Sequence, residues 1–189
     1  MRTELKSKAV VYPMPVLMIA TYDENGKVDV MNAAWGMICE PDKIFLSLSE
    51  SHKTVKNLKI TKAFTVSLAD AEHVKEADFF GIASGNTMED KFERSGLTAS
   101  KSEKVNAPVI EEFPVTMECE LAETVETDNV HAVIGKIVRA TADEKVLGED
   151  GQVDVSKSGI MMFDPFRLGY YVTGEKAGTA WNSGKELMD

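Results

Sequence analysis

Apolar and polar residues alternate over short runs along much of this chain, and a period of two residues is typical of β-strands. The first run covers Val16–Tyr22 and is followed by Asp23-Glu24-Asn25-Gly26. An Asn-Gly pair tolerates positive φ and is a common hairpin turn. The pattern therefore predicts a hairpin that returns the chain as a second strand over Val28–Asn32.

Further strand-like runs follow at short intervals. Extended chain is expected over Ala33–Cys39, Lys43–Leu48, Ala63–Leu68, Val115–Thr124 and His131–Thr141. The last two are separated by a short polar connection, which predicts another hairpin. A final strand, preceded by a turn, is expected within Met161–Val172.

Helical periodicity is limited to short segments. The spacing predicts a helix over Lys53–Ile60, with Ser51 as its N-cap and with Val55, Leu58 and Ile60 on its inward side. A second helix is expected after Asp70 and should stop at Gly81. The polar segment Thr98–Pro114 is expected to be a long surface connection.

Seven or so short strands joined mainly by hairpins favour a mainly β fold, an antiparallel barrel with short helices. The strand-helix alternation of a doubly wound sheet is missing, and no GxGxxG or Walker motif follows a strand. At 189 residues the chain fits a single domain over 1–189, since no linker divides it.

The formal net charge of −10 argues against a nucleic-acid partner, whose phosphates must be neutralised by Lys and Arg. No apolar run approaches the roughly 20 residues that cross a bilayer. No secretory signal is visible, so we expect a cytoplasmic protein without a membrane partner. Cys39 and Cys119 form no metal-binding spacing and are expected to be reduced, buried thiols.

One stretch combines features of an anion site. Ser51, Lys53, Thr54 and Asn57 lie at the start of a predicted helix, where free amides and the helix dipole attract phosphate. The residues alone equally allow a simple helix cap with lysines in solvent.

Asn32-Ala33-Ala34-Trp35 ends a predicted strand with small residues beside a large aromatic one. Such residues let a flat ring approach backbone amides and carbonyls. A tightly packed strand with a core Trp is the alternative.

The loop around Ser84, Gly85 and Lys91 offers a flexible backbone and another cation, or simply a turn with a solvated charge. His131 opens a strand alone, and no Ser/His/Asp arrangement, carboxylate pair or metal cluster can be assembled by spacing.

Taken in order, these residues resemble the flavin reductase-like, FMN-binding split-barrel family, and especially its flavoredoxin branch. The likeness runs from about Pro13 to Arg139. It is carried by an ordered set of short matches: Pro13-Met14-Pro15-Val16, Asn32-Ala33-Ala34-Trp35, Pro41, Ser51-His52-Lys53-Thr54-Val55-Lys56-Asn57, Ser84-Gly85, Asp90-Lys91-Phe92, Glu118-Cys119-Glu120, Asp128-Asn129-Val130-His131 and Gly135-Lys136-Ile137.

The resemblance implies a Greek-key, six-stranded split β-barrel that forms a homodimer and holds FMN noncovalently. It implies that Ser51, Lys53, Thr54 and Asn57 hold the phosphate and ribityl chain. Other residues would line or border the isoalloxazine, or approach it from a loop: Asn32, Ala33, Ala34, Trp35, Ser47, Ser49, Ser84, Gly85 and Lys91.

In such a protein the flavin carries hydride or single electrons, while the chain supplies orientation and electrostatics. The resemblance leaves the electron donor open between NADH, NADPH and a protein carrier. A noncatalytic flavin carrier or sensor is the alternative function, and a pyridoxamine-phosphate-oxidase-like enzyme is a weaker third.

Overall fold

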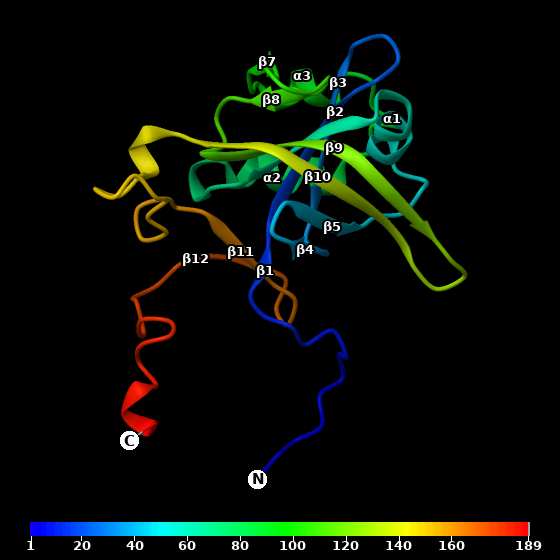
Figure 1. Cartoon of the computed structure of the whole chain (residues 1–189). Helices are drawn as coiled ribbons and strands as arrows, with labels where there is room; N and C mark the ends of the chain where they lie inside the picture. Colours follow the sequence, from blue (N-terminus) through cyan, green and yellow to red (C-terminus); the bar gives the residue numbers. More distant parts are fainter. Residues whose placement is uncertain (189) are drawn as a thin grey trace.

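A seven-stranded antiparallel sheet forms the centre of the computed structural model, which describes residues 1–188 (Figure 1). Its strands follow the order β3-β2-β6-β9-β10-β5-β4, and every neighbouring pair is antiparallel. The strands are β2 (Leu17–Tyr22), β3 (Val28–Ala33), β4 (Gly36–Glu40), β5 (Lys43–Ser47), β6 (Ala63–Leu68), β9 (Val115–Glu126) and β10 (His131–Ala142). Each strand expected in these regions is confirmed.

The sheet curls because its two outer strands are consecutive in the chain. Only Ala34 and Trp35 separate β3 from β4, although five strands lie between them in the sheet order. Two residues span too little distance to cross a flat sheet of this width. A Cβ on Gly36 would lie 2.7 Å from side-chain atoms of both Leu17 and Leu46. Leu17 lies on β2 and Leu46 on β5, so side chains from strands near the two ends of the sheet order meet there. The predicted antiparallel split barrel is confirmed, with seven strands in its main sheet instead of six.

Two smaller sheets complete the structure. One contains β1 (Met14–Pro15), β11 (Met161–Asp164) and β12 (Gly169–Val172). Met161–Val172 is therefore a hairpin of two strands, and the prediction of one final strand is wrong.

The other small sheet pairs β7 (Ala99–Lys101) with β8 (Pro108–Ile110), inside the segment expected to be a surface loop. That expectation is wrong, because Ala107, Ile110 and Phe113 bury their side chains against the barrel. The polar residues between these apolar ones concealed the hairpin.

Helices α1 (Lys53–Thr61), α2 (Val74–Ile82) and α3 (Lys91–Ser95) lie around the sheet, with short 3₁₀ turns at Ala71–His73, Glu144–Val146 and Lys185–Leu187. Val55 and Leu58 of α1 are buried as predicted, but Ile60 is exposed. The N-cap of α1 is His52, not Ser51, because the Ser51 hydroxyl pairs with Ser49.

Asp70 caps the 3₁₀ turn that leads into α2, where its carboxylate accepts from the His73 amide. Helix α2 continues one residue beyond Gly81, the predicted stop. Helix α3 ends at Gly96, whose φ of +71° favours glycine.

Two apolar cores hold the sheets and helices together. One lies inside the barrel and includes Leu17, Leu46 and Phe64. The other joins the sheet to α2 and the small sheets through Phe80, Ile110 and Met161. Cys119 is buried in the first core, where burial raises the pKa of its thiol to about 12. Cys39 is exposed on β4, so the prediction of a buried thiol is wrong there.

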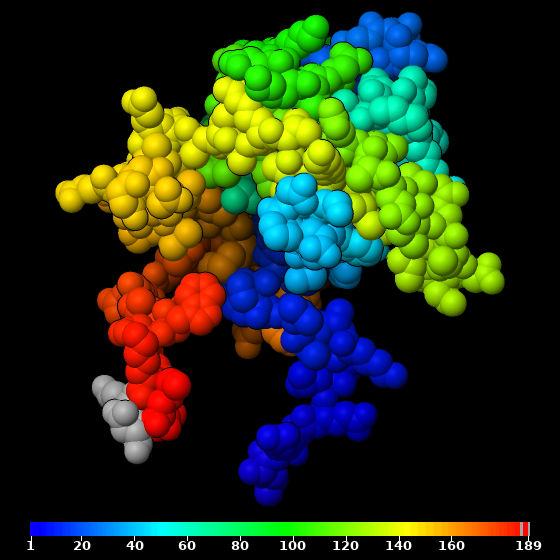
Figure 2. All heavy atoms as spheres, viewed as in Figure 1, coloured from blue at the N-terminus to red at the C-terminus, as the bar shows by residue number. Residues whose placement is uncertain are grey.

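Both ends of the chain extend from the same side of this body in Figure 2. Residues 1–12 are exposed, and among the described residues after Val172 every side chain described is exposed as well. No helix within residues 1–188 has the length and apolar character that a membrane span requires.

Glu118 is the least exposed acidic residue of the described chain and joins β9 to two other segments. It accepts hydrogen bonds from the Ser102 hydroxyl, the Lys104 amide and the Arg139 guanidinium, the last at 2.9 Å. Burial raises the pKa of this carboxyl, but the three donors and the charge of Arg139 outweigh it and lower the pKa below 4.5.

A carboxyl whose pKa is lowered on folding stabilises the folded state above its unfolded pKa and loses that contribution as pH falls. The free energy of unfolding should therefore decrease as pH drops below 4.5. Glu118→Gln should lower it at neutral pH by about 1–3 kcal/mol and weaken this acid dependence. Denaturant titrations of both chains across acidic pH would measure the effect, and parallel pH curves would contradict it.

Gly135 on β10 faces the ring of Phe64, and a Cβ at this position would overlap that ring. Gly135→Ala should lower the free energy of unfolding by about 1–3 kcal/mol, because the core is too full to accept a methyl group. Denaturant unfolding would show the change. Gly174→Ala is the matched control, since a Cβ there meets no atom within 4 Å. Equal effects of the two substitutions would contradict the argument.

Candidate functional site

Two adjoining cavities open between β3, the start of α1 and the end of α2. The first, which we call the cationic cavity, has a volume of about 300 Å³ and is lined by Lys53, Lys91, His52 and the loop Ala83–Gly85, among others. The second, the aromatic cavity, has about 250 Å³ and is lined by Asn32–Trp35, Asp78, Gly81, Ile82, Phe163 and Tyr170. Both cavities are lined by Asn32, Gly81 and Ile82, so they lie side by side.

The cationic cavity lies at the N-terminus of α1. The first turn of this nine-residue helix carries no acidic side chain, so its free amides and Lys53 give this end a positive potential. The Lys53 ammonium lies 3.6 Å from the Asp23 carboxylate in the β2–β3 turn. Lys53 also lines a neighbouring polar cleft of about 470 Å³, which shares Asp29, Gly85 and Lys91 with this cavity.

Asp29 forms part of the wall between α1 and the loop that contains Gly85. It is buried on β3, and one carboxylate oxygen accepts a 2.6 Å hydrogen bond from the Thr54 hydroxyl. A Cβ on Gly85 would overlap the other carboxylate oxygen. Glycine is thus needed for the loop backbone to approach this wall.

Lys91 is buried at the base of the cationic cavity, where its ammonium donates a 3.1 Å hydrogen bond to the Phe80 carbonyl. Burial lowers the pKa of Lys91, and the nearby Asp29 charge raises it less. Burial also lowers the pKa of His52, and the positive charge of Lys91 lowers it further. A bound anion would relieve the loss of solvation that these groups share.

The aromatic cavity combines a small-residue strand end with ring walls. Ala33 and Ala34 leave space beside the Trp35 indole, which is 55% exposed. Phe163 and Tyr170 of the β11–β12 hairpin also line this cavity, and the centroids of their rings lie 6.1 Å apart. Asn32 is fixed between the cavities, because its side-chain amide donates to the Ala77 carbonyl at 2.9 Å.

Nine of the thirteen residues predicted for the site line these two cavities: Asn32, Ala33, Ala34, Trp35, Lys53, Thr54, Ser84, Gly85 and Lys91. They come from separate parts of the chain that the fold brings together. The role of each in binding a ligand stays a prediction.

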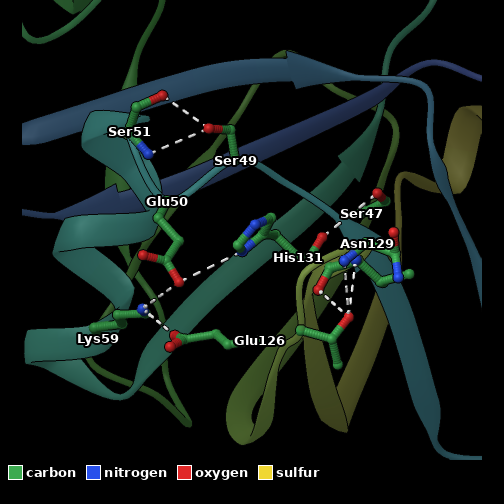
Figure 3. A network of polar contacts seen from close by, with 10 residues as sticks. Ser47, Ser49, Glu50, Ser51, Lys59, Glu126, Asn129 and His131 are labelled. Atoms are coloured by element: carbon green, nitrogen blue, oxygen red, sulfur yellow. Dashed lines mark hydrogen bonds and ion pairs between the residues drawn. The ribbon is translucent and has the colours of Figure 1, made fainter.

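The other four predicted residues line neither cavity. Asn57 is buried on the inner side of α1, where its amide donates to the Thr21 hydroxyl at 3.1 Å. Figure 3 shows Ser49 and Ser51 hydrogen-bonded to each other, while Ser47 reaches the carbonyl of His131 at 3.5 Å.

These serines adjoin an exposed cluster of charged residues that runs along α1 (Figure 3). Glu50 lies 3.7 Å from Lys59 and 3.6 Å from His131, and Lys59 also pairs with Glu126 at 2.5 Å. The cluster joins the start of α1, its last turn and the β9–β10 hairpin. In this structure His131 is therefore a surface residue that contacts this cluster through Glu50.

Sequence reasoning missed four polar residues of the two cavities: Asp29, His52, Asp78 and Tyr170. Asp29 carried a usable signal, because an acid between Val28 and Val30 is unfavourable within a strand unless it has a partner. Asp78 and Tyr170 gave none, since 91 residues separate them and only the fold makes them neighbours.

Comparison with known proteins identifies the family to which this architecture belongs. The family described as "Flavin reductase like domain" matches residues 9–171. Flavoredoxin of Desulfovibrio vulgaris (Miyazaki F) has a TM-score of 0.91 and 34% identity, with coverage of 97% of this chain and 100% of that one. Flavoredoxin from Methanosarcina acetivorans has a TM-score of 0.89 and 25% identity, with both chains fully covered.

More distant matches agree on the fold. An FMN-binding protein from Thermus thermophilus has a TM-score of 0.77 at 17% identity, covering 95% of this chain and 97% of that one, and it shows the fold alone. Among curated sequences, an uncharacterized protein of Aquifex aeolicus (strain VF5) is 26% identical over 155 residues, which are 78% of this chain and 79% of that protein. With the family match over most of its length and these flavoredoxin structures beside it, the chain belongs to the flavin reductase-like family, in its flavoredoxin branch.

Proposed function

We propose that this protein is a redox flavoprotein that binds FMN noncovalently and transfers electrons or hydride through it. The observation that carries the proposal is the adjoining pair of cavities, with cations lining one and aromatic rings lining the other. FMN has the same polarity, an anionic phosphate joined by a polar chain to a flat ring. The similarity to the two flavoredoxins and to the FMN-binding protein from Thermus thermophilus supports it.

The cationic cavity fits the phosphate end. The first amides of α1, the Lys53 ammonium and the Ser84 hydroxyl are the donors that would hold it, with the buried charge of Lys91 behind them. Thr54 fits this task less well than its sequence position suggested. Its hydroxyl proton is already donated to Asp29, so toward a ligand it offers only an oxygen lone pair.

The aromatic cavity fits the ring end. Ala33 and Ala34 present backbone groups without bulky side chains, and Trp35 can cover one side of a flat ring. Asn32 lies between the two cavities and is held by the Ala77 carbonyl, so it would orient the ligand where ring and chain join. Ser47, Ser49, Ser51 and Asn57 belong to this proposal only if binding moves them, because none lines either cavity.

When bound, FMN would supply the hydride and single-electron chemistry. The chain's own part is to position the ring, exclude water with Trp35, Phe163 and Tyr170, and hold the phosphate at α1. We further propose NADH or NADPH, or a protein carrier, as the electron source, and a homodimer as the assembly. The side chains of Met37 and Ile38 on strand β4 are exposed. Neighbouring apolar side chains at the surface support a contact with a second copy of the chain.

The phosphate assignment is testable by comparing FMN with riboflavin, which lacks the phosphate. Lys53→Ala should weaken FMN binding by about 1–2 kcal/mol, roughly tenfold, because a charge-assisted contact is lost. Riboflavin binding should stay nearly unchanged. Flavin fluorescence titration would measure both, with Lys136→Ala, an exposed lysine of β10, as the matched control. A wild-type chain that binds no FMN would refute the proposed function itself.

Anaerobic mixing of the FMN-loaded chain with NADH or NADPH separates the two functional classes. A reductase should bleach the flavin absorbance within seconds, and faster than free FMN under the same conditions. If neither nucleotide bleaches the flavin, the chain is a carrier, a sensor or a shuttle fed by another protein. Reduction by dithionite is the control that the bound flavin remains redox-competent.

A further inference from the structure

The Lys53 side chain borders both the cationic cavity and the polar cleft, and a carboxylate holds its ammonium on the cleft side. Lys53 lines both openings, whereas Asp23 lines the cleft alone. The ammonium lies 3.6 Å from Oδ2 of Asp23. The Lys53 stem lies beside Gly85, where an added Cβ would be 3.2 Å from the Lys53 Cγ. The cation that fits the phosphate end therefore already has an anionic partner.

Asp23 is held in place by the turn between β2 and β3. Its Oδ1 accepts hydrogen bonds from the backbone amides of Asn25 and Lys27, both at 2.9 Å. Two backbone hydrogen bonds of the same turn join Asp23 to Lys27 and to Gly26. The other oxygen, Oδ2, is the one beside Lys53. The carboxylate therefore cannot move away from Lys53 without giving up hydrogen bonds of the turn.

The negative charge of Asp23 is present at neutral pH. Burial raises the pKa of its carboxyl, but the two amide hydrogen bonds and the charge of Lys53 outweigh it and lower the pKa below its usual value. The Asp23 side chain is 13% exposed and the Lys53 side chain 32%. Water and salt screen such a pair less than a fully exposed one. A phosphate that reaches Lys53 meets this charge.

The two openings differ in their balance of charge. Among the described residues, four lysines and four carboxylates line the cleft: Lys27, Lys53, Lys56, Lys91, Asp23, Glu24, Asp29 and Glu89. In the same part of the chain, the cationic cavity is lined by two of these lysines and by Asp29 as its one acid. Lys53 belongs to both sets. The anion that holds its ammonium therefore decides which opening its charge serves.

We propose that Asp23 competes with the ligand's phosphate for the Lys53 ammonium and thereby makes bound FMN exchangeable. This rests on the proposed function, in which the phosphate of FMN occupies the cationic cavity. The opposite role for Asp23 would be to position Lys53 for the phosphate. Competition fits the geometry better, because Asp23 lines the cleft and not the cavity. An ammonium can donate to two anions at once, but a phosphate beside a fixed carboxylate is repelled by it.

Asp23→Asn tests the competition, because the amide oxygen can still accept from the turn while the charge is lost. The substitution should tighten FMN binding about fivefold, mainly through slower release. Riboflavin, which lacks the phosphate, should keep its affinity to within about twofold. Flavin fluorescence titration gives the affinities, and the fluorescence change after rapid dilution of the complex gives the release rates.

Three further variants assign the effect to the pair. Glu24→Gln removes the same charge from the same turn, but Glu24 is exposed, so FMN affinity should change by less than about twofold. Asp23→Ser can also accept from the turn amides and should tighten FMN binding as Asp23→Asn does. In a Lys53→Ala background, Asp23→Asn should have an effect below about twofold, because the contested ammonium is gone. Circular dichroism would verify that each variant folds.

Weaker FMN binding in both Asp23 variants would show that Asp23 positions Lys53, and the proposal would be wrong. Equal tightening of FMN and riboflavin, or the same gain without Lys53, would also contradict it.

Inorganic phosphate separates this outcome from a failure of the proposed function. Millimolar phosphate should raise the melting temperature of Asp23→Asn more than that of the wild-type chain, because the variant no longer holds Lys53. Equal shifts in the two chains would overturn the competition. If the wild-type chain binds no FMN, the proposed function fails, while the phosphate series still decides whether Asp23 competes for Lys53.

Discussion

The two-residue connection between β3 and β4 is the constraint on which the rest of this structure depends. These strands lie at opposite ends of the sheet order, yet Ala34 and Trp35 alone join them. The sheet has to curl until its outer strands meet, and Gly36 is the residue that permits the meeting, between Leu17 and Leu46. The barrel core around Phe64 is the apolar volume enclosed by that curl.

The same connection places the site. Where β3 ends, the strand pairing with β2 stops and backbone groups become available beside small side chains. Helix α2 and the β11–β12 hairpin pack near this end and provide the walls of the aromatic cavity, while the start of α1 provides the cationic one. A ligand with charge at one end and a flat ring at the other matches this arrangement because each end lies on a different structural element.

Buried polar and charged groups gather at the cationic cavity. Lys91 has the Phe80 carbonyl as its hydrogen-bond partner and Asp29 as a nearby opposite charge, while Asp29 accepts from Thr54. Burying charged groups away from water lowers the free energy of unfolding unless they have partners. An anion bound in the cavity would offset part of this cost for Lys91, and the proposed phosphate has the charge that this requires.

Alternation of apolar and polar residues predicted the strands of the main sheet, because it records which face of each strand is buried, and Asn25-Gly26 marked the first hairpin. The family resemblance also predicted that Asn32–Trp35, Lys53, Ser84, Gly85 and Lys91 belong to one site, and the fold brings these residues to two adjoining cavities. The sequence patterns misjudged the 98–114 hairpin, where apolar residues are sparse, and the N-cap, where Ser51 had a competing partner in Ser49. Only the tertiary structure decided that Asp29 meets Thr54 and that Asp78 meets Tyr170, because hydrogen bonds between distant segments depend on how strands and helices pack, and local sequence patterns carry no record of that packing.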